Sequence, residues 1–424
     1  MQFDSYWLAT APAFHGARQT PPEARYDVVV VGGGFTGLSA ARTLARGGAR
    51  VALLEAGRVI AEASGRNGGQ CNTGVAQDYA GLVAQIGRER AMSHYRHYAD
   101  ALASVRRVIA EERIDCDYRH HGKLKLAAKP EHYAKLARSA EAIARDVDSE
   151  VELIPRERIR EEIDSPHFHG GLLQKNGGQM HMGRFGVGLA EAAVAHGAHV
   201  FEHTPMTGVV RQAGGYRLTT PGGALQADDV LLATGASQQG PLGWFRRRLA
   251  PVGSFIVVTA PLSEAQCTAL LPQRRAYVTS RIVGHYFRLT PDRRLLFGGR
   301  ARFAMSGGKS DRKSGEVLSR GLAHTFPSLA DIGIDYCWGG LVDMSRDRLP
   351  HAGRHDGMYY VMGYSGHGVQ MSVHMGQCLA EVMLGQRDAY PWQETHWPAI
   401  PGHFGKPWFL PLVGGWYRLQ DRLH

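Results

Sequence analysis

The clearest pattern of apolar and polar positions lies between residues 26 and 56. An apolar run at 28–31 (VVVV) is typical of a parallel strand that is buried on both faces. A glycine-rich turn follows, and apolar residues then recur at helical spacing over 38–44. A second apolar run at 51–54 ends at Glu55. The pattern therefore predicts a strand–helix–strand unit.

The rest of the chain alternates between helical and strand patterns. Helical spacing is expected at 80–113, 130–147, 182–198, 313–326 and the end of 358–385. Strands are expected at 121–128, 199–206, within 216–236, at several places from 250 to 300, and at the start of 358–385. We therefore predict an α/β fold with a doubly wound nucleotide-binding domain and a second domain rich in antiparallel strands.

Length and composition narrow the class of protein. The chain has 424 residues, enough for two or three structural units with ample core, and its 44% hydrophobic and 21% charged residues are typical of a globular protein. The formal charge is +10, but the basic residues are scattered and match no nucleic-acid motif. We interpret the charge as a solvated basic surface, or as compensation for an anionic cofactor or an acidic substrate.

Targeting signals and disulfide patterns are missing from the sequence. The five cysteines form an odd set without a CxxC pair, which favours a reducing compartment. The N-terminus MQFDSYWLATAP lacks the order of a secretory signal, and no apolar run approaches the roughly 18 residues of a membrane span. We expect a soluble, cytoplasmic protein without a membrane span. The sequence gives no estimate of its oligomeric state.

The glycine-rich turn carries the spacing GxGxxG in the context that nucleotide binding requires. Gly32 permits the tight turn, Gly34 lets a pyrophosphate approach the backbone, and Gly37 allows close packing of helix on strand. The helix N-terminus offers free amide groups and the positive end of its dipole. Glu55, 18 residues after the last motif glycine, is placed to accept bonds from ribose hydroxyls. This fingerprint does not distinguish FAD from NAD.

Two further segments favour a cofactor that spans much of the molecule. Residues 62–74 (EASGRNGGQCNTG) combine four glycines with polar side chains directly after the first unit. A predicted buried strand at 228–236 ends in ATGA, and SGHG at 365–368 precedes a long helix. Each of these turns can present backbone amides to a ligand.

With these motifs the chain resembles the FAD-dependent amine oxidases of the D-amino-acid oxidase and glycine/sarcosine oxidase superfamily. The likeness is strongest to gamma-glutamylputrescine oxidase-type enzymes. It covers nearly the whole chain and rests on SYWLATA (5–11), VVVVGGGFTGLSAARTLA (28–45), LLEAGRV (53–59), ASGRNGGQ (63–70), HGKLKLA (121–127), GHYFRLT and LLFGGR (within 284–300), SRDRLPHAGR (345–354) and YSGHGVQ (364–370).

The resemblance implies the domain division and the cofactor contacts. It places a discontinuous FAD-binding domain at 1–114, 176–249 and 331–424, and an inserted, mostly antiparallel substrate domain at 115–175 and 250–330. The FAD would be held without a covalent bond. Its contacts would come from Gly32, Gly34, Phe35, Thr36, Gly37, Glu55, Ala56, Ser64, Arg66, Asn67, Gly68, Gly69, Gln70, Met206, Gly235, Gly366, His367, Gly368 and Val369.

The implied reaction is the oxidation of a small-molecule amine. A hydride passes from the carbon next to nitrogen to flavin N5, and the imine is hydrolysed to an aldehyde or ketone. Oxygen then takes the electrons and gives H2O2. Sarcosine-oxidase-type relatives carry a lysine near the position of Leu296, which is thought to activate oxygen. Because this chain has leucine there, an amine or D-amino-acid dehydrogenase that reduces a quinone or carrier is the alternative.

Several side chains have competing interpretations. His367 and Tyr286 are candidate catalytic groups, although His367 can equally serve only through its backbone. His285, Phe287 and Cys71 are candidate substrate contacts. Because strand residues alternate between faces, either His285 and Phe287 or Tyr286 alone should face the flavin. Cys71 is expected to pack in a wall and not to bind FAD covalently.

Two remaining features lie outside the nucleotide motifs. His196, His199 and His203 cross a helix end and a strand, so their rings should diverge, and we predict no metal site. The tail at 391–424 is rich in proline and aromatic residues. We expect it to pack across its own domain; an interfacial membrane helix and a wall of the substrate tunnel are the alternatives.

Overall fold

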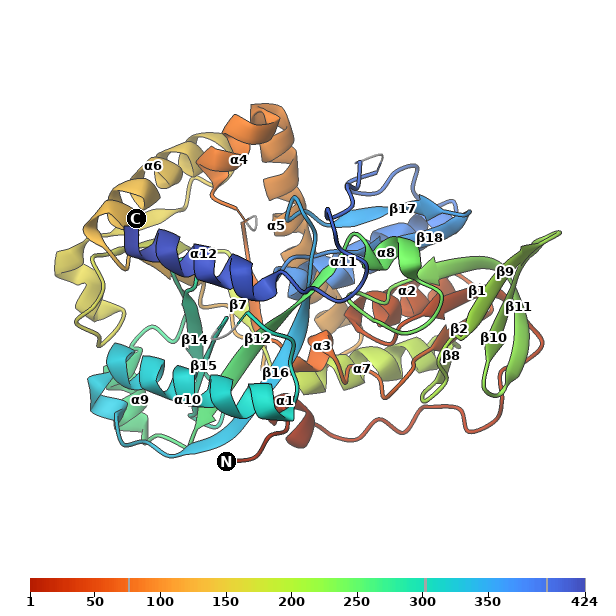
Figure 1. The fold of residues 1–424 in the computed structure, drawn as a ribbon, viewed down its shortest axis with the longest axis horizontal. Coiled ribbons are helices and arrows are strands. Elements are labelled where there is room, and N and C mark those ends of the chain that lie inside the picture. Colours follow the sequence, from red (N-terminus) through yellow and green to blue (C-terminus); the bar gives the residue numbers. More distant parts are fainter. Residues whose placement is uncertain (75–76, 301–302, 394–395, 424) are drawn as a thin grey trace.

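Two eight-stranded sheets lie side by side in the computed structural model, which describes residues 1–74, 77–300, 303–393 and 396–423 (Figure 1). One sheet is mainly parallel and the other mainly antiparallel. This mixed arrangement confirms the predicted α/β fold class. The elements that form the two sheets come from alternating parts of the sequence.

The first sheet has the strand order β8-β2-β1-β11-β18-β17, with β10 and β9 attached at β11. From β8 to β18 every pairing is parallel, and the apolar run at 28–31 pairs with β2 on one side and β11 on the other. Its strands are β1 (Arg25–Val31), β2 (Val51–Leu54), β8 (His199–Phe201), β9 (Gly208–Gln212), β10 (Gly215–Thr220), β11 (Gly223–Leu232), β17 (His351–His355) and β18 (Met358–Met362).

Helices cover one face of this sheet. The helix α2 packs against α7 and α11, and α11 packs against the long helix α5. Val28 and Val30 of β1 enter this helix-covered core, whereas Val29 and Val31 enter the core on the other face, beneath β9 and β10. The helices of this layer are α2 (Phe35–Arg46), α5 (Arg88–Glu111), α7 (Met182–Ala195) and α11 (Gly368–Met383).

The second sheet has the order β16-β12-β15-β14-β13-β4-β6-β5, and only the pairing of β13 with β4 is parallel. The helix α10 (Gly308–Thr325) packs on its outer face. Its strands are β4 (Lys123–Leu126), β5 (Glu152–Ile154), β6 (Gly171–Gln174), β12 (Ala250–Thr259), β13 (Ala276–Thr279), β14 (His285–Leu289), β15 (Leu295–Gly299) and β16 (Ile334–Met344). A small antiparallel pair, β3 (Gln70–Asn72) and β7 (Gly177–Gln179), completes the strands.

The remaining helices are short or peripheral. Residues 80–113, predicted as one helix, form two, because Gly87 adopts a φ of 85° between them. These other elements are α1 (Tyr6–Ala9), α3 (Ala63–Arg66), α4 (Tyr79–Ile86), α6 (Pro130–Asp146), α8 (Gly243–Arg246), α9 (Glu264–Leu270), α12 (Leu410–Leu423) and the 3-10 helices η1 (Arg156–Glu161) and η2 (Pro327–Leu329).

Side chains alternate between the two faces of the second sheet, and each face belongs to a different hydrophobic core. In β15, Leu295 and Phe297 face the outer core beneath α10, whereas Leu296 faces the first unit. Cys337 and Trp338 of β16 divide in the same way. The inner face of the second sheet therefore meets the carboxyl ends of the first sheet's strands, where ligands bind in open α/β sheets.

The chain passes between the two sheets more often than the predicted domain ranges require. β16 falls within 331–424, expected for the FAD-binding domain, yet it is hydrogen-bonded along β12 of the second sheet. The N-terminus also crosses, since Gln2 pairs with Tyr336 of β16. The division into two domains stays a prediction. Across the described ranges, no helix combines the length and apolar character needed to cross a bilayer.

Candidate active site

The predicted nucleotide turn joins β1 to α2 through close backbone contacts. Gly32 has a φ of 112°, a conformation that favours glycine. A side chain at Gly37 would overlap the carbonyl oxygen of Gly32, so the helix can approach the strand only with glycine at this position. Glu55 follows β2, and its carboxylate accepts from the amides of Gly33 (2.6 Å) and Gly57 (2.7 Å). Burial raises the pKa of Glu55, and these two bonds oppose the rise.

The segment around α3 closes over the start of α2. The Ser64 hydroxyl accepts from the amide of Phe35 at 3.0 Å, in the first turn of α2. The Arg66 guanidinium donates to the carbonyls of Ala61 (2.8 Å) and Gly339 (2.9 Å). These bonds tie α3 to both the nucleotide turn and β16, so the segment links the two sheets.

Residues 67–70, which we call the floor, are held in place by hydrogen bonds with side chains. The Asn67 side chain accepts from the Gly69 amide at 2.8 Å, and the Trp7 indole donates to the Asn67 carbonyl at 2.7 Å. Arg288 is fully buried and donates to the Gly69 carbonyl at 2.5 Å. Gln70 points to the second sheet, where its amide donates weakly to two strand carbonyls. The floor is therefore fixed before any ligand is added.

Two more turns face the same region. Gly235 follows β11 with a φ of 51°, and a side chain there would come within 3.8 Å of the Asp343 carboxylate. Asp343 accepts from the Gly363 amide at 2.7 Å, and burial raises its pKa to about 6. Gly366, with a φ of 93°, begins the turn that leads into α11. The helix N-terminus at α11 directs amide groups toward this region.

Three buried polar atoms without partners lie along this region, where a polar ligand would satisfy them. Within the described part of the chain, Thr234 Oγ1, His367 Nδ1 and Asn72 Oδ1 are buried and accept or donate no hydrogen bond. Such atoms cost free energy unless a ligand or water satisfies them. They come from three separate segments, next to β11, α11 and β3. The residues therefore fit an extended cofactor such as FAD, with amides and glycines along its length.

The orientation of β14 determines which of its side chains face the floor. The ring of Tyr286 lies against Gly68, since an added side chain at Gly68 would come within 2.6 Å of it. The Tyr286 hydroxyl lies 3.2 Å from Ser254 Oγ. His285 and Phe287 lie on the opposite face, where both rings pack on Phe297. The structure thus brings Tyr286 to the site and places His285 and Phe287 in the outer core.

Cys71 and Leu296 both face inward as packing residues. Cys71 is fully buried, and burial raises the pKa of its thiol. Leu296 is also fully buried in the core between the two sheets. The neighbours of Cys71 on β3, Gln70 and Asn72, point the other way, and the Asn72 carbonyl accepts from Gln370 of α11 at 2.6 Å. β3 therefore joins the floor to α11.

Positive charges near His367 form a feature that the motifs did not identify. Lys123 and Lys125 lie on the same side of β4, half-buried, between the buried Leu124 and Leu126. The pKa of Lys123 is lowered to about 7 by burial and by Lys125. The sequence carried a signal for these charges. KLKL alternates charged and apolar residues, so both lysines lie on one face of a strand that is not at a sheet edge.

His367 lies among these charges. Its pKa is lowered to about 3, mainly by burial and then by Lys123 and Arg300. Arg300 follows β15, and its guanidinium lies 4.0 Å from the position of a side chain on Gly366. Burial is also the main cause that lowers the pKa of Arg300. We call Lys123, Lys125 and Arg300 the cation group; these three charges, and not the neutral His367, give this part of the site a positive potential.

The three histidines considered for a metal diverge. His196 contacts Glu112 at 3.0 Å, and His199 contacts Arg18 at 2.6 Å and Tyr26 at 3.1 Å. Over the part of the chain that the structure describes, no group of three or more His, Cys, Asp or Glu side chains is placed to hold a metal ion. The rings of His196 and His199 instead serve separate contacts.

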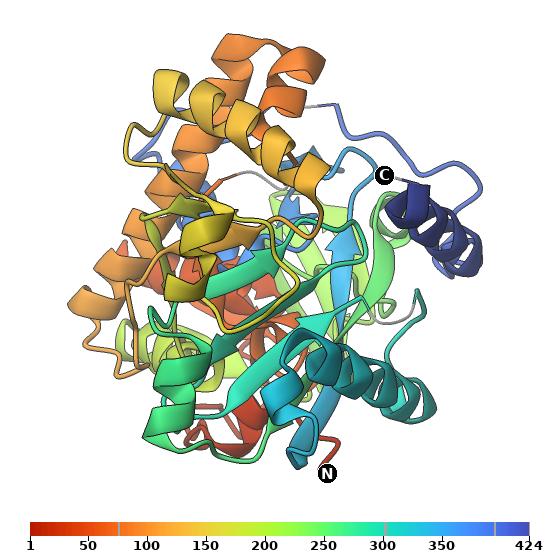
Figure 2. The same cartoon turned by 90° about the vertical axis from the view of Figure 1, so that its left-hand side faces the viewer.

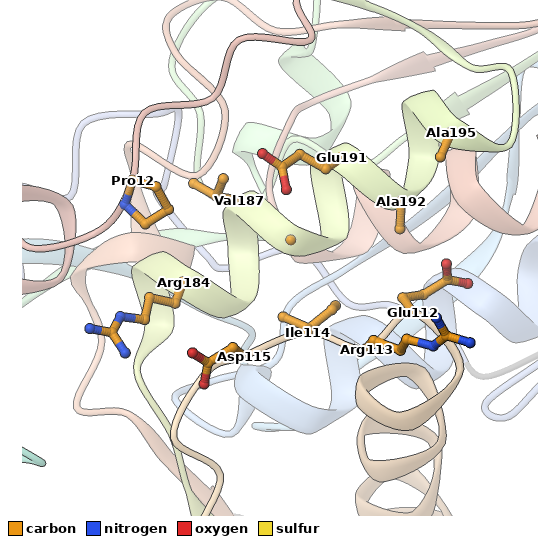
Figure 3. Close-up of a pocket in the computed structure, with 11 residues that line it drawn as sticks. Pro12, Glu112, Arg113, Ile114, Asp115, Arg184, Val187, Glu191, Ala192 and Ala195 are labelled. Carbon is orange, nitrogen blue, oxygen red and sulfur yellow. The ribbon is translucent and has the colours of Figure 1, made fainter.

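A surface depression of about 460 Å³ lies away from this region, between α7 and the segment after α5 (Figure 3). Arg184 points to its rim and pairs with Asp117 at 2.9 Å. Glu112 pairs with Arg42 and His196. No predicted site residue lines this depression, so it is separate from the region that the motifs identify.

Comparison with known proteins agrees with this geometry. A model of the family "DAO: FAD dependent oxidoreductase" matches residues 27–382. The gamma-glutamylputrescine oxidoreductase of Escherichia coli K12 is 31% identical over 423 residues, which cover 99% of this chain and 98% of that protein. The glycine oxidase of Bacillus licheniformis is 25% identical over 88% of this chain and 96% of that protein.

A solved structure shows the same fold. The crystal structure of glycine oxidase from Geobacillus kaustophilus superimposes with a TM-score of 0.73 at 23% identity, covering 88% of this chain and 99% of that chain. The family match spans most of the chain, from β1 to the end of α11. The resemblance found in the sequence is thereby confirmed, as is FAD as the cofactor. The chain belongs to the DAO family of FAD-dependent oxidoreductases.

Proposed function

We propose that this enzyme oxidises a small amine that carries a carboxylate group. When bound, FAD supplies the acceptor for a hydride from the carbon next to the amine nitrogen. Relatives support the amine, because their names specify gamma-glutamylputrescine, glycine and sarcosine. The substrate would lie between the floor at 67–70 and the inner face of the second sheet, beside Tyr286. The imine that forms would hydrolyse to an aldehyde or ketone.

The cation group is the observation that carries the choice of a carboxylate-bearing substrate. Lys123 donates one hydrogen bond to the Thr73 carbonyl at 2.8 Å and keeps further donors for a ligand. The salt bridges of the described residues include none to Lys123, Lys125 or Arg300, although the charge of Asp78 acts on Lys125 and opposes the lowering of its pKa. Half-buried charges of one sign repel each other, and an opposite charge between them relieves that repulsion. A substrate carboxylate would supply that charge.

The same positive potential favours the reactive form of the amine. Only an unprotonated amine has the free electron pair that helps expel a hydride. Nearby positive charges disfavour a protonated amine and so lower its pKa. His367 adds no further charge near neutral pH, because its pKa is about 3. Its unpartnered Nδ1 is available to orient a bound group.

We propose oxygen as the electron acceptor, with H2O2 as product. The cation group supports this choice, because positive charge stabilises the anions formed when oxygen is reduced. A quinone or carrier is the second candidate, and Leu296 favours it. That residue is an uncharged, fully buried side chain where sarcosine-oxidase-type relatives have a lysine. A cytoplasmic location stays part of the proposal.

A matched pair of amines tests the substrate class. The FAD-loaded enzyme is mixed anaerobically with γ-aminobutyrate, β-alanine and sarcosine, and with their counterparts propylamine, ethylamine and dimethylamine, which lack the carboxylate. We expect loss of the visible flavin absorbance with at least one acid, at a concentration about tenfold below that of its counterpart, a difference of about 1.4 kcal/mol. A preference for the uncharged counterparts would contradict the carboxylate, and reduction by no amine would contradict amine oxidation.

The acceptor is tested on the same reduced enzyme. It is mixed separately with oxygenated buffer and with a soluble quinone, and the return of flavin absorbance is followed by stopped flow while peroxide is assayed. Fast reoxidation with stoichiometric peroxide supports oxygen. Reoxidation by the quinone alone supports the second candidate.

A further inference from the structure

Exposed apolar side chains gather at the C-terminal end of the chain. Ten large hydrophobic side chains of the described residues are strongly exposed, and six of them lie between 404 and 423. The six, which we call the outer strip, are Phe404 (76% exposed), Trp408 (67%), Leu412 (69%), Trp416 (58%), Leu419 (46%) and Leu423 (70%). Clustering of this kind marks an interaction surface.

The helix α12 presents most of the outer strip along one side. Its strip residues are spaced four, three and four apart, which aligns them on one helix face. The opposite face is already used: Leu410 is buried, and Gly414 packs directly on Phe303. Figure 2 shows α12 at the edge of the molecule, with one side turned away from both sheets. The helix α12 thus has two apolar faces: one packs on the protein, and the outer strip is exposed.

The polar groups of α12 leave this face without negative charge. Asp421 is the single acid between 404 and 423, and its two carboxylate oxygens accept from the amides of Ile282 and Val283, both at 2.8 Å. Lys129 donates to the Asp421 carbonyl at 2.8 Å. The acid therefore fastens α12 to the loop between β13 and β14 and is not available to a partner.

Basic groups border the outer strip. The Arg247 guanidinium lies over the ring of Phe404, 5.2 Å from its centre. Lys406 and Arg418 are exposed in the same segment. An apolar face with tryptophans and a basic border is the composition of a helix that lies in the interface of an anionic membrane. Indole rings suit that position, since one part of the ring is apolar and the other carries a polar N–H.

We propose that the outer strip binds the surface of an anionic phospholipid bilayer. A second copy of the chain fits less well, because a two-fold interface would bring the same basic border of each copy together. Lipid phosphates provide the opposite charge. The inner face of α12 also reaches toward the candidate site: Tyr417 accepts from Arg348 at 2.9 Å, and Arg348 lies close enough to Arg300 to lower its pKa. A docked α12 would hold the site near the membrane surface.

Vesicle binding tests the proposal on the FAD-loaded enzyme. Vesicles of phosphatidylcholine with 40% phosphatidylglycerol are compared with pure phosphatidylcholine by flotation, at low and at 0.5 M salt. We expect binding to the anionic vesicles, a shift of tryptophan emission to shorter wavelength, and loss of binding at high salt. Leu412→Ser with Trp416→Ser should weaken binding about tenfold or more.

A matched control separates this surface from general stickiness. Val210 is 63% exposed on β9, far along the chain from α12, and Val210→Ser should bind vesicles like the unmodified enzyme. All variants should keep their flavin absorbance. No flotation with anionic vesicles overturns the proposal, and so does equal binding by the double variant. A dimer that the double variant dissociates assigns the strip to a second copy and also overturns it.

Discussion

At the scale of single residues, the site depends on side chains that are charged or neutral for identifiable reasons. Lys123 is partly protonated at neutral pH, because burial and Lys125 lower its pKa to about 7. His367 is kept neutral over the physiological range by its own burial and by the same cations. One group therefore titrates near neutral pH while its neighbour does not. The affinity for substrate should therefore change with pH as Lys123 loses its proton.

Lys123→Gln should raise the KM for a carboxylate-bearing amine about tenfold and change kcat less. The unmodified lysine is charged below about pH 7 and neutral above it, so its attraction for a carboxylate falls as pH rises. KM for the unmodified enzyme should therefore increase between pH 6 and 8, whereas the variant should lack this increase. Steady-state kinetics across this range measure both effects.

Lys135→Gln is the matched control, since Lys135 is exposed on α6. It should keep the unmodified pH profile. A Lys123→Gln enzyme with the unmodified KM at pH 6 would contradict a role in substrate binding.

Gly37→Ala should remove FAD binding and destabilise the fold. The added methyl group would overlap the carbonyl of Gly32, a backbone atom that cannot rotate away. Overpacking typically costs about 1–3 kcal/mol, and shifting α2 would also misplace the nucleotide turn. Gly243→Ala is the control, because nothing lies within 4 Å of its added methyl group. Flavin content and urea unfolding give the comparison, and a flavin-replete Gly37→Ala protein would contradict it.

At the scale of elements, short polar segments tie the nucleotide turn to its surroundings. Ser64 belongs to α3, but its hydroxyl serves α2 by accepting from the Phe35 amide. The Asn67 side chain within the next turn closes on Gly69. The first contact connects two elements that are separated in the chain by β2, and the second holds the turn of the floor itself. Their loss should loosen the floor without unfolding the sheets.

Ser64→Ala should lower the free energy of unfolding by about 1 kcal/mol, the usual effect of losing a side-chain acceptor at a helix start. It should also weaken FAD binding, since α2 begins at the proposed pyrophosphate site. Ser64→Thr, which keeps the hydroxyl, should restore most of both. Urea unfolding and flavin titration of the apoprotein measure them, and an Ala variant as stable as the Thr variant would contradict the contact.

Much of this arrangement was predictable at the element scale, where periodicity is strong. The helix–strand pattern of β1, α2 and β2 and the strand pattern from 250 to 300 follow from local residue spacing. The sidedness of β14 did not, because alternation alone leaves two equivalent choices until Phe297 is seen to occupy the outer face. The position of β16 depends on pairing with β12, a contact more than 70 residues away in sequence.

The cation group was missed for a related reason. KLKL indicates that two lysines share a face, but nothing local to β4 shows that this face lies opposite α11. That relation arises from the packing of the second sheet on the first. The predicted FAD contacts, in contrast, are carried by contiguous motifs and remain our prediction for the cofactor site.

At the scale of the whole molecule, the proposed FAD site is assembled from distant parts of the chain. The turn at Gly32, the floor at 67–70, Gly235 after β11 and the start of α11 meet only in the folded protein. A ligand that binds only the folded state stabilises it by mass action. FAD at about 100 times its Kd should therefore add about 2.7 kcal/mol to the free energy of unfolding.

FAD is expected to bind without a covalent link to the protein. Cys71 directly follows the floor at 67–70, yet its thiol is fully buried and its raised pKa disfavours the reactive thiolate. Acid precipitation should therefore leave all flavin in the supernatant. The Cys71→Ala variant should bind FAD, with a stability loss of the size expected for a small core truncation. Flavin that remains with the precipitate of the unmodified enzyme, and not with that of Cys71→Ala, would show that Cys71 attaches the cofactor.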